Sequence, residues 1–152
     1  MVRTGRSVAA RGLLEKAVAL DPGDVESRYH LAVVLGEMGQ ARRAEELLGS
    51  VVRLRPDYLA AREQLGLNHL RRGDQEGAAR EANAILARSP RAAEGHRLMA
   101  LILWKQRDIE GSLAECALAL ANANVRSDSS SVISSLNRYR KLRELINKTL
   151  IG

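Results

Sequence analysis

The chain has few residues that could carry out chemistry, and their spacing argues against catalysis. The single cysteine, Cys116, has no second thiol with which to form a disulfide or share a metal ion. The three histidines, His30, His69 and His96, stand too far apart in sequence to form a ligand pair on one helix. No glycine-rich phosphate loop, HExxH motif, or Ser or Cys nucleophile with a histidine and an acid at a familiar spacing occurs. We therefore predict that the chain is not an enzyme and uses no metal and no cofactor.

The net charge of +6 and a pI near 10.1 raise the question of nucleic-acid binding. Residues 127–152 carry a net +3, whereas the repeats themselves are nearly balanced. No zinc-finger or helix-turn-helix pattern accompanies the basic residues, so we predict no nucleic-acid partner. Arg6, Arg11, Glu15 and Lys16 interrupt the apolar residues near the start, and no segment is apolar enough to span a bilayer. We therefore expect no signal peptide, no membrane insertion and a cytoplasmic location.

The elements that would position these residues recur at a constant interval along the chain. All three prolines, Pro22, Pro56 and Pro90, are separated by the same step of 34 in the numbering. Small or apolar residues align at that step in the columns Ala10/Ala44/Ala78/Ser112, Leu14/Leu48/Ala82/Cys116, Ala17/Val51/Ile85/Ala119, Val18/Val52/Leu86/Leu120, Leu31/Leu65/Met99 and Ala32/Gly66/Ala100. Such a period is typical of a repeat array, whose units bury their apolar faces only by stacking on one another.

Within each unit the apolar residues recur with helical spacing, which predicts two amphipathic helices. We place these helices at residues 25–38 and 41–54, 59–72 and 75–88, and 93–106 and 109–122. Gly39 and Gly73 suit the left-handed backbone that ends a helix, and Arg107 stands at the equivalent position of the third unit. Asp74 and Asp108 are expected to cap the helices that follow them.

Small residues are expected to face one another within each unit, so that its two helices approach closely. These pairs are Ala32 with Ala44, Gly66 with Ala78, and Ala100 with Ser112. Cys116 lies in an apolar column, so we expect a buried, reduced thiol.

The repeating unit resembles the tetratricopeptide repeat in its length and in its motif. The leucine of the family signature corresponds to Leu31, Leu65 and Met99, and its small residue to the column Ala32/Gly66/Ala100. Its alanine corresponds to the column Ala44/Ala78/Ser112, and its closing proline to Pro56 and Pro90. The chain departs from the family pattern at its tryptophan position, which holds Arg28, Arg62 and His96, and at its tyrosine position, which holds Leu35, His69 and Leu103. The resemblance implies an all-α fold, an α-α superhelix of antiparallel helix pairs.

The repeat array is expected to cover residues 1–126. It comprises a half repeat at 5–22 and full repeats at 25–58, 59–92 and 93–126. The serine-rich run at 127–135 predicts a hinge and a break in the repeat. An apolar stripe follows at Val132, Leu136, Tyr139, Leu142, Ile146 and Leu150. We therefore predict that 127–152 form a serine-rich hinge and a C-terminal capping helix.

In the family that this chain resembles, the first helix of each unit lines a concave groove that binds a peptide. The resemblance implies three rows there, Tyr29/Glu63/Arg97, Val33/Leu67/Leu101 and Gly36/Leu70/Trp104. We predict that peptide binding uses Tyr29, Val33, Glu63, Leu67, Leu70, Arg97, Leu101 and Trp104. Trp104 would anchor the ligand or pack against the end helix. Glu63 and Arg97 would orient the ligand or pair with each other.

Some family members bind acidic chaperone tails through a clamp of Lys, Asn and Arg. The corresponding positions here hold Tyr29, Val33, Gln64, Glu94 and Leu98, which argues against that ligand. The sequence thus predicts a protein-interaction scaffold with a protein or peptide ligand. Two alternatives are a regulatory or targeting domain of a longer enzyme and a scaffold that self-associates through its terminal helices. In a further hypothesis, the chain's own end helix occupies the groove.

Overall fold

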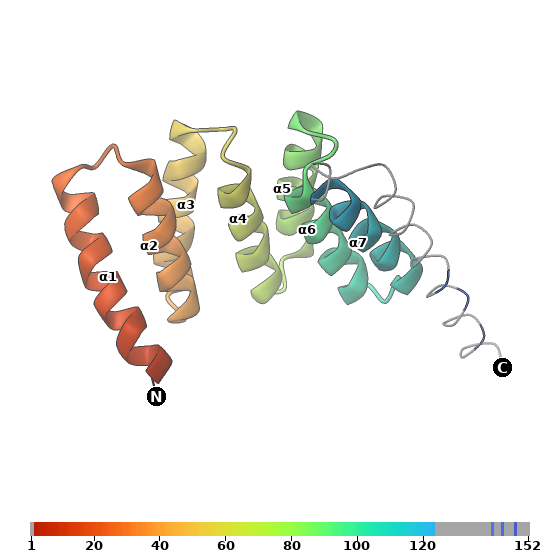
Figure 1. Ribbon diagram of the computed structural model, residues 1–152, viewed down its shortest axis with the longest axis horizontal. Coiled ribbons are helices and arrows are strands. Elements are labelled where there is room, and N and C mark those ends of the chain that lie inside the picture. The colour runs from red at the N-terminus through yellow and green to blue at the C-terminus, as the bar shows by residue number, and fades with distance from the viewer. Residues whose placement is uncertain (1, 124–140, 142–143, 145–147, 149–152) are drawn as a thin grey trace.

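The computed structural model describes residues 2–123, 141, 144 and 148 of the chain. Residues 2–123 form seven α-helices (Figure 1). They are α1 (Val2–Leu20), α2 (Val25–Glu37), α3 (Ala41–Leu54), α4 (Leu59–Arg71), α5 (Gln75–Arg88), α6 (Ala93–Lys105) and α7 (Ile109–Ala123). The described part of the chain contains no β-strand, so the predicted all-α fold class is confirmed. The predicted hinge and capping helix at 127–152 lie outside the described residues, except for residues 141, 144 and 148.

The helix boundaries follow the local signals in the sequence. Gly39 and Gly73 adopt positive φ angles of 78° and 80° after α2 and α4, and Arg107 adopts 66° after α6. The oxygen Oδ1 of Asp74 accepts a hydrogen bond of 2.8 Å from the backbone N–H of Gly77 and caps the start of α5. The equivalent Asp108 accepts one from Gly111 at 2.9 Å. The left-handed residue recurs after the first helix of all three units, and the aspartate cap recurs in the second and third units.

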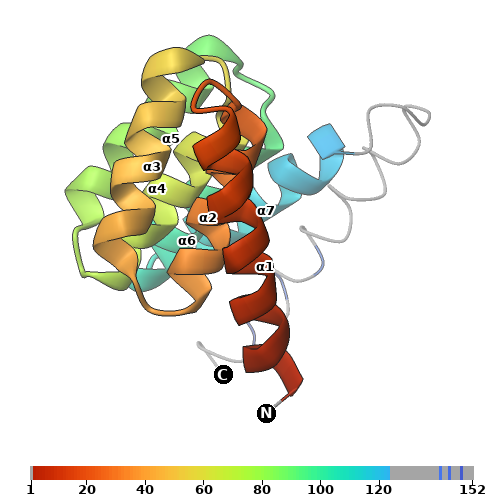
Figure 2. The ribbon, with the colours of Figure 1, turned by 90° about the vertical axis from the view of Figure 1, so that its left-hand side faces the viewer.

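The helices stack as antiparallel pairs along the long axis of the molecule, from α1 at one end to α7 at the other (Figure 1). Figure 2 views the stack from its N-terminal end, with α1 nearest the viewer. The first helices of successive pairs contact each other, α2 with α4 and α4 with α6, whereas the second helices of the described pairs do not. This difference places α2, α4 and α6 on the inner side of the curved array.

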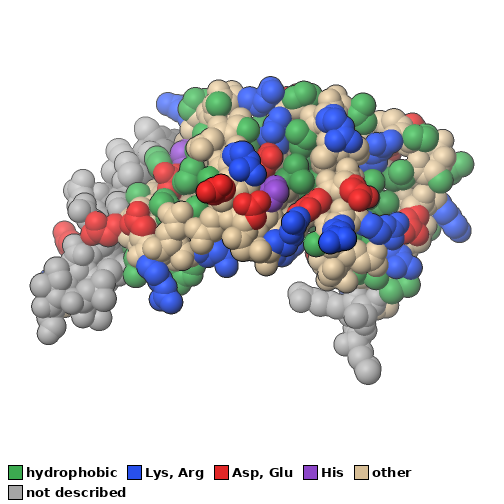
Figure 3. All heavy atoms as spheres, turned by 180° about the vertical axis from the view of Figure 1, so that it is seen from behind, with side chains coloured by type: hydrophobic (Ala, Val, Ile, Leu, Met, Phe, Trp, Pro, Cys, Tyr) green, Lys and Arg blue, Asp and Glu red, His purple; other side chains and the backbone are tan. Residues whose placement is uncertain are grey.

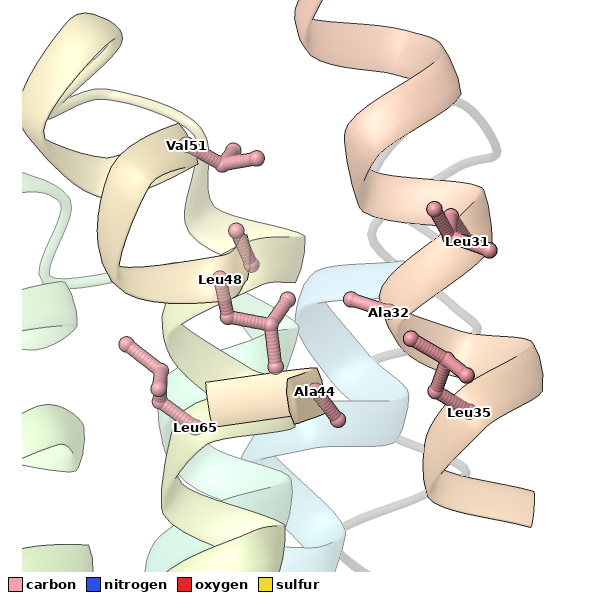
Figure 4. Packing of buried hydrophobic residues seen from close by; sticks show 8 residues of the cluster. Leu31, Ala32, Leu35, Ala44, Leu48, Val51 and Leu65 are labelled. Carbon is pink, nitrogen blue, oxygen red and sulfur yellow. The ribbon is translucent and has the colours of Figure 1, made fainter. Parts of the chain in front are cut away.

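The core between the helices is made mainly of leucine, valine, isoleucine and alanine. One cluster joins α2, α3 and α4, and Figure 4 shows its side chains converging from the three helices. It consists of Leu31, Ala32, Leu35, Ala44, Leu48, Val51, Ala61 and Leu65, with Leu14 and Val18 of α1 packed against it. A second cluster joins α4, α5 and α6 through Leu70, Ala78, Ala82, Leu98 and Ile102. Each unit therefore completes its core with the helix that follows it.

Small residues let the helices approach, as expected, but not always within one unit. Ala32 and Ala44 are both buried in the first cluster, and Ser112 Oγ donates a 2.9 Å hydrogen bond to the carbonyl of Ala100. At Gly66, however, the nearest atoms to an added Cβ would belong to Leu98 of the next unit. Gly66 is therefore small because α6 packs against it, and the predicted pairing within its own unit does not account for it.

The prediction of a buried Cys116 is wrong, because its side chain is exposed on α7. The residues that precede it in the same column, Leu48 and Ala82, are 1% and 0% exposed. Leu48 and Ala82 are covered because α4 and α6 follow their units, whereas no described helix follows the unit that contains Cys116. A column in the sequence therefore predicts burial only where another unit stacks on it.

Candidate functional site

The eight residues that the sequence singles out lie on α2, α4 and α6, the first helices of the three units. In the first row, Arg97 and Glu63 form a bidentate ion pair between α6 and α4. Arg97 Nε donates to Glu63 Oε1 at 2.9 Å, and Arg97 Nη2 donates to Glu63 Oε2 at 3.0 Å. Donating these hydrogen bonds to Glu63 raises the pKa of the Arg97 guanidinium. Of the two predicted roles for these side chains, the structure shows the mutual pair.

Tyr29 begins the same row and packs among rings. Its ring centroid lies 5.1 Å from that of Tyr58 and 5.2 Å from that of His30. Burial raises the pKa of the Tyr29 hydroxyl, with smaller contributions from nearby carboxylates. The Tyr58 hydroxyl donates to Glu26 Oε2 at 2.7 Å, which ties the start of α4 to the start of α2. Sequence reasoning missed Tyr58, because its column, Asp24/Tyr58/Ala92, has no common residue type.

The second row becomes more exposed toward the C-terminal end of the array. Val33 on α2 and Leu67 on α4 are half-buried, whereas Leu101 on α6 is 43% exposed. The apolar part of this row that a ligand could contact is therefore concentrated on α6.

The third row differs sharply between its members. Leu70 is only 5% exposed and packs with Leu98 and Ile102 of the following helix, so its assignment to the binding wall is wrong. The equivalent position of the next repeat holds Trp104, which is 60% exposed. The predicted row therefore contains a core residue in the second repeat and an exposed aromatic residue in the third.

Two hollows flank Trp104 at the C-terminal end of the described array. The first has a volume of about 510 Å³ and lies between α6 and α7. Its lining residues, which we call the end surface, are Arg97, Ala100, Leu101, Trp104, Ser112, Leu113 and Cys116. The second, of about 660 Å³, is lined by Leu101, Trp104, Lys105, Arg107 and Ile109. Sequence reasoning did not connect Cys116 with this site, although its apolar column on the last repeat was a usable signal.

The described residues contain no other arrangement that points to chemistry. No group of three or more His, Cys, Asp or Glu side chains within residues 2–123, 141, 144 and 148 could hold a metal ion. None of the described helices is both long and apolar enough to cross a membrane. On the face seen in Figure 3, acidic and basic side chains are intermixed and do not gather by sign. The end surface is thus an open surface lined mainly by apolar side chains.

Helix pairs of one constant length, stacked into a curved array with an apolar surface at one end, define an α-helical solenoid. The chain belongs to the tetratricopeptide repeat family, because two family models with that description match residues 2–65 and 64–127. This result confirms the family that the sequence motifs indicated. None of the curated proteins matches the chain.

Solved structures show the same fold. A MamA protein from Desulfovibrio magneticus is 21% identical, with a TM-score of 0.64 over 97% of this chain and 89% of that one. A thermophilic tetratricopeptide-repeat protein from Thermus thermophilus is 22% identical, with a TM-score of 0.65 over 92% of each chain. A further MamA crystal structure is 19% identical, with a TM-score of 0.66 over 82% of this chain and 73% of that one.

Proposed function

We propose that this chain is a protein-interaction scaffold whose end surface binds an amphipathic helix of a partner protein. Its membership of the tetratricopeptide repeat family supports a scaffold in general. The observation that supports this particular surface is the exposure of Leu101 and Trp104, at 43% and 60%, beside an apolar hollow. Large apolar side chains that gather at a hollow mark an interaction site, and tryptophan is a frequent anchor of interfaces.

The shape of the surface supports a helical ligand. In the two preceding repeats the equivalent surfaces are covered by α4 and α6, so each accepts one helix. Leu98 and Ile102, which stand one helical turn apart on α6, enter the second core cluster together. A ligand helix with apolar residues at positions i and i+4 would therefore fill the end surface in the same way.

The remaining residues of the predicted site have supporting roles in this proposal. Tyr29, Val33 and Leu67 line the inner face as partly exposed contacts. Glu63 and Arg97 bind each other, so they shape the wall between α4 and α6 without offering an unpaired charge. We also propose that the scaffold works in the cytoplasm, because reducing compartments preserve a free thiol such as Cys116.

The proposal is tested with a library of synthetic amphipathic helices that carry leucine pairs at i and i+4. Binding to the full chain is measured through the fluorescence of Trp104, the only tryptophan, and independently by calorimetry. We expect selected peptides to lose about tenfold or more in affinity for Leu101→Asp and for Trp104→Ala, since truncating an anchor costs about 2 kcal/mol. The melting temperature should stay unchanged because both side chains are exposed.

The matched control is Leu20→Asp, which changes a leucine that is 88% exposed on α1 at the opposite end. Peptides that bind all of these variants equally would refute the assignment to the end surface. Sedimentation of the full chain without peptide tests the alternative of self-association. A dimer that Trp104→Ala dissociates would show that a second copy occupies this surface.

A further inference from the structure

The larger of the two hollows beside Trp104 combines apolar and cationic side chains. This hollow of about 660 Å³, which we call the basic hollow, is lined by Leu101, Trp104, Lys105, Arg107 and Ile109. It shares Leu101 and Trp104 with the end surface, so a ligand seated on the end surface also borders the basic hollow. Three of its described lining residues are apolar, two are cationic and none is acidic. The basic hollow therefore favours a ligand that carries negative charge next to an apolar group.

The two cations of the basic hollow are available to a ligand. Lys105 and Arg107 are both exposed, and within the described part of the chain neither side chain forms an ion pair or a hydrogen bond. Arg97, which lines the end surface, differs because Glu63 already binds its guanidinium. Asp108 follows Arg107 in the sequence, but its carboxylate caps the start of α7. The positive charges of Lys105 and Arg107 are therefore left for a partner.

The equivalent positions of the other two repeats lack this combination. The third repeat has Trp104, Lys105 and Arg107, the second has Leu70, Arg71 and Gly73, and the first has Gly36, Glu37 and Gly39. All three sets of residues end the first helix of a unit in the same fold, so the fold itself does not require two cations beside a tryptophan. The combination occurs in the repeat that also exposes a large aromatic side chain.

The backbone at Arg107 gives a second reason to assign its side chain to binding. Its φ is 66°, a left-handed conformation that glycine adopts in the other two repeats. Two backbone hydrogen bonds hold the turn: Arg107 N–H donates to the carbonyl of Trp104 at 3.1 Å, and Asp108 N–H donates to that of Leu103 at 2.9 Å. Strained residues of this kind cluster at binding sites, where the surrounding structure holds them in place.

We propose that the partner helix is acidic, with carboxylates that bind Lys105 and Arg107 while its apolar residues cover Leu101 and Trp104. This inference rests on the proposed function of the end surface and adds the charge of the ligand. Exposed ion pairs contribute little free energy, but they orient a ligand and exclude ligands of the wrong charge. The site also differs from the clamp for acidic chaperone tails, whose corresponding positions here are Tyr29, Val33, Gln64, Glu94 and Leu98.

The test uses the full chain and three versions of each peptide in the leucine-pair library. The versions hold glutamate, glutamine or lysine at positions i+1 and i+5, on one side of the apolar stripe. Affinity is measured through the fluorescence of Trp104 and by calorimetry. We expect the glutamate version to bind about tenfold more tightly than the lysine version, since two attractive pairs replace two repulsive ones. The difference should shrink at high salt, which screens exposed charges.

Charge reversal in the protein locates the effect. In Lys105→Glu/Arg107→Glu the lysine version should become the tightest ligand, and glutamate at 107 keeps the Cβ, so the backbone strain does not change. If that variant unfolds by circular dichroism, Lys105→Gln/Arg107→Gln should bind all three versions alike. The matched control is Arg6→Glu/Lys16→Glu, which reverses two exposed cations on α1 at the opposite end and should leave the order of affinities unchanged.

The results separate this inference from the proposed function. If all three versions of a peptide bind equally well, the function of the end surface stands and the acidic partner is wrong. If no version binds, both proposals fail. A preference for glutamate that Arg6→Glu/Lys16→Glu also inverts would assign the effect to net charge and overturn the site. Vesicles containing phosphatidylserine that bind the natural chain but not Lys105→Glu/Arg107→Glu, while no peptide binds, would show an anionic lipid surface in place of the partner helix.

Discussion

His96 and Arg62 occupy the same repeat position and make equivalent contacts in successive repeats. Arg62 Nε donates to the carbonyl of Pro56 at 3.1 Å, and Arg62 Nη1 lies 3.3 Å from Oε2 of Glu81. The equivalent partners of His96 are Pro90, whose carbonyl oxygen lies 2.9 Å from Nε2, and Glu115, whose Oε2 lies 2.6 Å from Nδ1. Each of these side chains therefore links the loop before its unit to both helices of the unit. The family signature has tryptophan at this repeat position.

The comparison of the two repeats predicts which residues can replace His96. His96→Arg should keep most of the stability, because a guanidinium makes the same two contacts at Arg62. His96→Ala should cost about 1.5–3 kcal/mol, since it leaves the half-buried carboxylate of Glu115 without its partner. Urea unfolding at constant pH measures both free energies. An alanine variant as stable as the arginine variant would show that these contacts contribute nothing.

The helix boundaries could be predicted from the sequence, whereas the contacts between helices could not. The six helices at residues 25–123 begin and end within one residue of the predicted bounds, because Gly39, Gly73 and Asp74 act on the adjacent backbone. The partners of Arg62 and His96 were not predicted. Glu81 and Glu115 lie on the second helices of their units, and they contact Arg62 and His96 only because the two helices pack together.

The site was predicted less completely for a related reason. Leu70 and Trp104 share a repeat position, yet one is in the core and the other is exposed. Their exposure depends on whether another helix stacks on the unit, and a single repeat position does not contain that information. Cys116 was assigned to the core for the same reason.

A double-mutant cycle at the close contact between Gly66 and Leu98 tests how tightly the second and third units are coupled. Gly66→Ala should destabilise the chain by about 1–3 kcal/mol, because the new methyl group would overlap the leucine side chain. Leu98→Ala should cost about 2–5 kcal/mol by leaving a cavity. The double variant should cost less than the sum, since the alanine methyl would partly fill that cavity. Additive changes in the free energy of unfolding would contradict this packing.

The pH dependence at high pH should report the contact between Tyr58 and Glu26. Burial, together with the hydrogen bond to Glu26, raises the pKa of Tyr58 to about 12 from its ordinary value of 10.0. Because the folded pKa lies above the unfolded one, the stabilisation is fully present below pH 10 and is lost as the pH rises through about 12. Glu26→Gln should lower the pKa of Tyr58 in an NMR titration of the tyrosine ring carbons. A titration curve identical to that of the natural chain would show that the carboxylate has no effect.

Arg107 occupies a backbone conformation that glycine adopts in the other two repeats, so it should limit the stability of the third unit. Its φ of 66° compares with 78° at Gly39 and 80° at Gly73. A left-handed conformation costs a residue with a Cβ about 1–2 kcal/mol, and glycine avoids this cost. Glycine also gives the unfolded chain more conformational entropy, which offsets about 0.5–1 kcal/mol of that gain. Arg107→Gly should therefore stabilise the chain by up to about 1 kcal/mol, and Gly73→Arg should destabilise it by a similar amount.

The pair of substitutions separates backbone strain from the loss of a side chain. If Arg107 were retained for contacts that outweigh the strain, Arg107→Gly would lower the melting temperature, and Arg107→Ala would lower it further. If strain dominates, Arg107→Gly raises the melting temperature while Arg107→Ala leaves it nearly unchanged, because alanine keeps the Cβ that the left-handed conformation disfavours. Arg107 also lines the hollow of about 660 Å³ beside Trp104, so peptide affinity measured on the same variants shows whether the strained residue serves binding.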